Sequence, residues 1–259
     1  MIKKIILSII ITCIASSNAL CREERLKERS STHFIVYYKD APKEFIDSVI
    51  DSAEDYYHSI TRELGLRRTD FWLWDDRGKI YIHSDREDYI ASSGQPHWSA
   101  GSALFEEKTI HTYPMASGFF DTLLPHELGH IIFREFIGFR RDIPTWCDEG
   151  VAMYQEKARR WGSKKIVQQA IEDGTFMTLD ELTAFNLRFA RDEKKVTLFY
   201  NEATSIIYFL LKEHGRNNFI EFCRGLRDGK EFEEAFDDAY VRFDSIEDLN
   251  TAWMRYLKE

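Results

Sequence analysis

The stretch that decides the architecture covers residues 121–156 and reads DTLLPHELGHIIFREFIGFRRDIPTWCDEGVAMYQE. It contains the segment HELGH, which begins at His126 and ends at His130. Positions four apart on an α-helix differ by about 40° around the axis, so both imidazoles should point to one side. Neutral imidazole suits Zn²⁺, and Glu127 between them is placed to reach a water at the metal. Apolar flanks predict that this segment is a buried helix over 120–137.

The five-residue pattern is not decisive alone. By residue frequencies it should occur by chance in roughly one chain of this length per hundred. The alternative is a pair of helix histidines held by nearby carboxylates without a metal.

A third ligand is expected from the segment after the helix. From His130 to Gly138 the helix would descend about 12 Å, and from Pro144 to Glu149 a second, antiparallel helix would climb back about 7.5 Å. Proline is a good first helical residue, and this second helix is predicted over 144–160. Glu149 should therefore reach the level of the histidines. Its neighbour Asp148 is interpreted as a surface carboxylate near a helix start.

Together, HExxH and a Glu in WxxEGxA, separated by eighteen residues, resemble the gluzincins. More narrowly they resemble small peptidase-MA-like domains related to thermolysin and to zinc aminopeptidases, over roughly residues 78–258. The resemblance implies an α+β, zincin-like fold, with an N-terminal twisted mixed sheet with helices, an active-site helix and a C-terminal helical lobe. It implies one Zn²⁺ held by His126, His130 and Glu149, and hydrolysis of a peptide or protein substrate with Glu127 as general base.

The resemblance also implies a donor to the oxygen that becomes negative during hydrolysis, supplied by a Tyr or His on a later helix. Tyr200, which opens the segment YNEAT, matches that position. The alternative is a core tyrosine with a wet hydroxyl. Tyr208 is interpreted as core, and His214 as a residue favoured at a helix C-terminus.

Two features depart from the relatives. The segment Gly-x-Met-x-Asn, which anchors the substrate amine in the aminopeptidases, is absent, which puts exopeptidase action in doubt and leaves endo- versus exopeptidase action open. Met153 stands where thermolysin-like relatives have an acid behind a ligand histidine, so that support must come from elsewhere.

The remaining pattern places strands first and helices afterwards, as in α+β proteins. The N-terminal sheet lobe is predicted over 30–137 and the helical lobe over 138–259, as one catalytic domain. Strands are predicted over 33–38, 79–83 and 109–113, and further helices over 42–64, 164–172, 200–213, 216–226 and 245–258. The strand 109–113 is predicted to be the edge strand beside the cleft, with His111 facing either substrate or, more simply, solvent.

Residues 1–20 have the order of a signal peptide, with Lys3 and Lys4, then an apolar run, then small residues. We therefore expect export to the periplasm or the extracellular space. Cys21 offers a possible lipid anchor in an imperfect context, and otherwise no contact with a membrane is expected. Removing this segment takes two Lys and moves the formal charge from −9 to −11, which disfavours nucleic-acid binding. If Cys21 carries a lipid, Cys147 and Cys223 are the natural disulfide pair in an oxidising compartment.

A rival hypothesis is a zinc-binding domain that recognises a peptide or an envelope protein without cleaving it. The presence of Glu127 argues against it, because metal binding alone does not require that residue.

Overall fold

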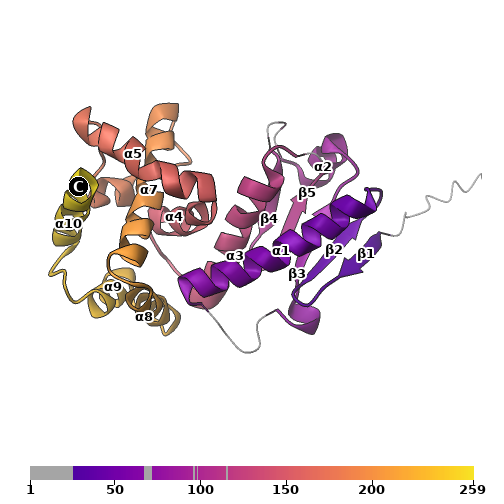
Figure 1. The fold of residues 1–259 in the computed structure, drawn as a ribbon, viewed down its shortest axis with the longest axis horizontal. Coiled ribbons are helices and arrows are strands. Elements are labelled where there is room, and N and C mark those ends of the chain that lie inside the picture. The colour runs from indigo at the N-terminus through magenta and orange to yellow at the C-terminus, as the bar shows by residue number, and fades with distance from the viewer. Residues whose placement is uncertain (1–25, 67–71, 96, 98, 115) are drawn as a thin grey trace, which may run out of the picture.

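The computed structural model describes residues 26–66, 72–95, 97, 99–114 and 116–259. A sheet with helices comes first and a mostly helical part follows, so the predicted α+β, zincin-like fold is confirmed (Figure 1). The predicted signal peptide and Cys21 lie outside the described residues. In the described part, no helix is long and apolar enough to cross a membrane.

The sheet is mixed and has five strands in the order β1-β2-β3-β5-β4. They are β1 (Lys27–Ser30), β2 (Phe34–Tyr38), β3 (Gly78–Ile82), β4 (Gly101–Leu104) and β5 (Thr109–Thr112). Strands β2, β3 and β5 run parallel, while β1 and β4 are antiparallel to their neighbours at the two edges.

The inner face of the sheet is apolar across the three parallel strands. Val36 lies opposite Ile80, and Ile80 lies opposite Ile110; all three are buried. Helix α1 (Lys43–Leu64) runs across this face (Figure 1). Its apolar residues recur at helical spacing, and its end at Gly65 uses a positive φ of 76°, which glycine adopts without strain. The early helix predicted over 42–64 therefore packs on the sheet.

The prediction that residues 109–113 form the edge strand of the sheet was wrong. Strand β5 lies inside the sheet, between β3 and β4, and the edge nearest to the helical part is β4. The sequence GSAL of β4 is short and poor in β-branched residues, so it carries almost no strand signal. His111 packs beside other rings of the sheet: its Nδ1 lies 3.1 Å from Nε2 of His83, and its ring stacks on Tyr81.

The helices of the second part share one continuous apolar core with the sheet part. The sheet part also contains the short helix α2 (Arg86–Ser93). The later helices are α3 (Leu124–Ile137), α4 (Thr145–Gln155), α5 (Lys157–Glu172), α6 (Leu179–Ala184), α7 (Glu193–Lys212), α8 (Arg216–Arg227), α9 (Phe232–Ala239) and α10 (Ile246–Lys258). Helices α2, α6 and α9 are short and were not predicted.

Two predicted helices are interrupted. The segment predicted as one helix over 120–137 begins as a π-helical turn, Phe119–Leu123, before α3 starts. Pro125 then lies in the first turn of α3, where its missing N–H is not needed. The helix predicted over 144–160 breaks at Glu156, whose backbone is extended at φ −77° and ψ 96°.

The predicted disulfide is not formed. Cys147 and Cys223 are both buried free thiols. Burial raises the pKa of each thiol, and Cys147 further raises that of Cys223, so both stay protonated near neutral pH.

Candidate metal centre and catalytic site

Helix α3 carries both histidines and helix α4 carries the glutamate, and the loop between them brings the three donors together. The two histidine Nε2 atoms lie 3.2 Å apart. Oε2 of Glu149 lies 3.8 Å from Nε2 of His126 and 3.6 Å from Nε2 of His130. The three side chains form one of the clusters that could hold a metal ion.

Two glycines allow the supporting helices to approach this closely. A Cβ added at Gly129 would lie 2.9 Å from Cα of Ala152, so α3 and α4 touch at that point. A Cβ added at Gly150 would lie only 2.4 Å from the carbonyl oxygen of Ala203, on α7. Each glycine is the sequence neighbour of a proposed ligand, so the backbones meet beside the donors.

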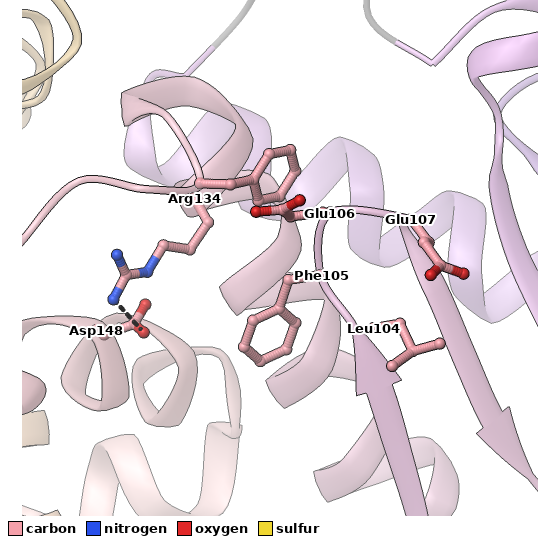
Figure 2. Close-up of a pocket in the computed structure, with 7 residues that line it drawn as sticks. Leu104, Phe105, Glu106, Glu107, Arg134 and Asp148 are labelled. Carbon is pink, nitrogen blue, oxygen red and sulfur yellow. Dashed lines mark hydrogen bonds and ion pairs between the residues drawn. The ribbon is translucent and has the colours of Figure 1, made fainter.

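Behind His130 stands a carboxylate and then a guanidinium. Nδ1 of His130 lies 3.2 Å from Oδ1 of Asp148. Nη2 of Arg134 donates to Oδ2 of Asp148 at 2.8 Å (Figure 2). Nη1 of Arg134 donates to the carbonyl of Arg141 at 2.7 Å. The interpretation of Asp148 as a surface carboxylate was wrong, because its side chain is only 13% exposed. Burial alone would raise the pKa of Asp148, but His130 and Arg134 lower it, so the carboxylate stays charged.

A similar set of groups stands behind His126. Its Nδ1 lies 2.9 Å from Oε1 of Glu156, and Oε2 of Glu156 lies 2.8 Å from Nε of Arg159. Glu156 is the residue at which the chain leaves α4, and its side chain is only 3% exposed. The acid missing at Met153 is therefore supplied three residues later. Sequence reasoning missed it, because no Gly or Pro marks the break in the helix.

The donor chemistry fits a zinc ion. Each Nδ1 faces a carboxylate and is the natural site of the ring proton, which leaves a lone pair on each Nε2. Two lone pairs and a carboxylate oxygen then converge on one point, which requires a cation. Donors about 2.0–2.2 Å from a tetrahedral zinc ion would lie about 3.3–3.5 Å apart, close to the observed separations.

The protonation of His130 supports the same conclusion. Burial alone would lower its pKa, but contacts with Asp148 and Glu149 outweigh burial and raise the pKa to about 10. A metal ion that binds Nε2 of this imidazole must displace a proton from it.

Glu127 follows the first histidine in the first turn of α3 and is partly buried. Burial raises the pKa of its carboxyl group, and the neighbouring Glu149 raises it further, while His126 and His130 oppose the shift. A carboxylate with a raised pKa is a better proton acceptor than an exposed one.

Tyr200 lies on α7, near Glu149. Burial and then the charge of Glu149 raise the pKa of its phenol to about 12, so the hydroxyl keeps its proton and can donate it in a hydrogen bond. The other two residues considered as donors pack elsewhere. Tyr208 contacts the rings of Tyr154 and Trp161, and His214 packs against Phe209 and other rings of the helical part.

The chain that leaves edge strand β4 also reaches the site. The ring of Phe105 stacks on the imidazole of His130, with centroids 5.0 Å apart. Beside it lies an open cavity of about 430 Å³ whose lining includes Leu104, Phe105, Arg134 and Asp148 (Figure 2). The edge strand therefore ends at the metal centre and at a hollow beside it.

Comparison with known proteins and with protein families identifies the family of the chain. No curated protein matches the chain. The model of the peptidase MA superfamily matches residues 78–259, which include β3, the edge strand, both ligand helices and the whole helical part. The chain therefore belongs to the peptidase MA superfamily.

Proposed function

We propose that this chain is a zinc-dependent peptidase that hydrolyses peptide bonds. Membership of the superfamily implies a metallopeptidase. The observation that carries the proposal is the convergence of His126, His130 and Glu149 on one point. These three residues would hold a single zinc ion, which when bound supplies a Lewis acid that polarises water and the peptide carbonyl.

In the proposal Glu127 takes the proton of the attacking water and passes it to the leaving amine. Its place directly after His126 and its raised pKa support that role. Tyr200 would donate its hydroxyl proton in a hydrogen bond to the peptide oxygen as negative charge develops there. The extended peptide would lie along β4, whose outer edge has no neighbouring strand in the described sheet.

We also propose that the enzyme is exported. The support is the order of charge, apolar residues and small residues over 1–20. A lipid anchor at Cys21 is a further proposal, which mass spectrometry of the purified mature chain would test.

Glu127→Gln tests the chemistry separately from the metal. The amide cannot accept a proton, so hydrolysis of a quenched fluorescent peptide library should fall by about a hundredfold or more. Zinc content by elemental analysis and the melting temperature should match those of the wild type. A variant as active as the wild type would reject the role of Glu127. A wild type that binds zinc but cleaves no peptide would favour a non-catalytic recognition domain.

Tyr200→Phe removes one hydroxyl and keeps the ring. Loss of an oxyanion donor typically costs about 3 kcal/mol, so kcat should fall roughly a hundredfold with little change in melting temperature. A purely structural tyrosine would behave in the opposite way, with normal turnover and about 1 kcal/mol less stability. Measurement of kcat and melting temperature on one sample decides between the two roles.

A further inference from the structure

A second group of metal-binding side chains lies in the sheet part. It consists of His33, directly before β2, with Glu54 and His58 on α1, and its possible donor atoms all lie within 4.8 Å of one another. We propose that these three residues form a second site for a divalent transition-metal ion such as Zn²⁺.

The local structure directs three donors to one point. Glu54 and His58 are four residues apart on α1 and therefore share a helix face. Nδ1 of His33 lies 2.6 Å from Oε2 of Glu54, and Nε2 of His58 lies 3.9 Å from the same oxygen. Oε2 is thus the atom common to both imidazoles.

The other oxygen of Glu54 is held in place by the backbone. The N–H of His33 donates to Oε1 at 2.8 Å, so the carboxylate cannot rotate freely. A metal ion at Oε2 would find this carboxylate already oriented, as ligating carboxylates in proteins generally are.

The two histidines differ in freedom. The ring of His33 stacks on Tyr57 with centroids 4.0 Å apart, and its side chain is only 12% exposed. His58 is 63% exposed and meets the ring of His33 edge-on at 5.2 Å. His33 and Glu54 therefore already face each other at hydrogen-bond distance, and an entering ion would displace the proton between them and spread the two donor atoms to about 3.3–3.5 Å. His58 is free to move in from solvent as the third donor.

The donor set selects the class of ion. Two imidazole nitrogens with one carboxylate suit Zn²⁺, Cu²⁺ or Ni²⁺, whereas Ca²⁺ and Mg²⁺ prefer oxygen ligands. A simple ion pair between His33 and Glu54 would explain their contact, but it gives no role to His58. A bound ion uses all three and fastens the start of β2 to α1.

The test is a Zn²⁺ titration of the chelator-treated chain, with bound zinc counted by elemental analysis. Wild type should bind two equivalents. His58→Ala changes an exposed residue, so it should fold normally and lose affinity for one equivalent by at least about tenfold. Glu54→Gln should lose the same equivalent. His97→Ala, a change at another exposed histidine, should still bind two.

Comparison with His130→Ala separates this site from the proposed catalytic one. His130→Ala should keep the equivalent that His58→Ala loses. If the catalytic proposal fails and this one holds, the wild type binds a single equivalent that is lost in His58→Ala and kept in His130→Ala. The inference is overturned if the wild type binds no zinc, or if His58→Ala binds as many equivalents as the wild type with unchanged affinity.

Discussion

Each histidine of the candidate metal centre is backed by a carboxylate and an arginine, but the two carboxylate–arginine supports are built differently. Behind His130, Asp148 and Arg134 lie between helices α3 and α4, and the arginine side chain is 16% exposed. Behind His126, Glu156 is more deeply buried, while Arg159 at the start of α5 is 50% exposed. The arginine behind His130 is therefore mostly buried, whereas the arginine behind His126 is half exposed to solvent.

The difference follows from local structure. His130 and Arg134 are four residues apart on one helix, and Asp148 directly precedes Glu149, so regular helices create the support behind His130. The support behind His126 exists only because the chain leaves the helix at Glu156 and starts a new one. Regular geometry supplies the first, and an irregular junction supplies the second.

The largest expected difference is in stability. Arg134→Ala leaves the buried Asp148 without its cation and should lower the free energy of unfolding by about 3 kcal/mol. Arg159→Ala removes a half-exposed partner and should lower it by about 1 kcal/mol or less. Urea denaturation of the two variants beside the wild type measures both. Equal losses of unfolding free energy in the two variants would show that Arg134 and Arg159 contribute equally to stability, against this prediction.

Loss of either carboxylate should act on the metal. Asp148→Asn and Glu156→Gln should each weaken zinc binding by about tenfold, because each change removes the carboxylate that orients a ligand imidazole. Competition with a chromophoric chelator measures this affinity. Asp148→Asn should also lower the melting temperature, since Arg134 is left without a countercharge, whereas in Glu156→Gln the side chain of Arg159 can turn to solvent. A lower melting temperature only in Glu156→Gln would reverse the comparison.

Glu202 shows what a buried carboxylate does without a cation. It lies on α7 with no exposed surface, and the N–H of Met177 donates to its Oε1 at 3.0 Å. Burial raises its pKa from the ordinary 4.5 to about 8, the opposite of the shift at Asp148. Between these two values the folded state holds a proton that the unfolded state has lost, so a rise in pH destabilises the fold.

This proton predicts a smaller, pH-dependent effect. A rise from about pH 6 to about pH 7 should lower the free energy of unfolding of the wild type by about 1 kcal/mol through Glu202. Glu202→Gln cannot titrate and should lose this contribution. Urea midpoints of both proteins at the two pH values test it. Identical pH slopes would show that the pKa of Glu202 is not raised in the folded protein.

Sequence reasoning reached the fold class and the positions of the three donors because both depend on helical periodicity. The spacing of four brings His126 and His130 together, and a helix hairpin brings Glu149 to them. It missed strand β4, whose sequence GSAL has no strand pattern of its own and which is held by pairing with β5. It also missed Glu156, because no Gly or Pro in the sequence marks the break between α4 and α5. The catalytic roles of Glu127 and Tyr200 stay predictions.

The contacts at Gly129 and Gly150 have a consequence for changing the metal centre. Helices α3, α4 and α7 meet there with backbone atoms in close approach, Gly129 against Cα of Ala152 and Gly150 against the carbonyl oxygen of Ala203. The distances between the helices are therefore set by atomic radii, and should change little with temperature or with substitutions elsewhere in the lobe. The three helices therefore fix the position of each donor residue, so its side chain can be changed without moving its backbone. A cysteine or histidine in place of Glu149 would offer a metal a different atom from nearly the same backbone position.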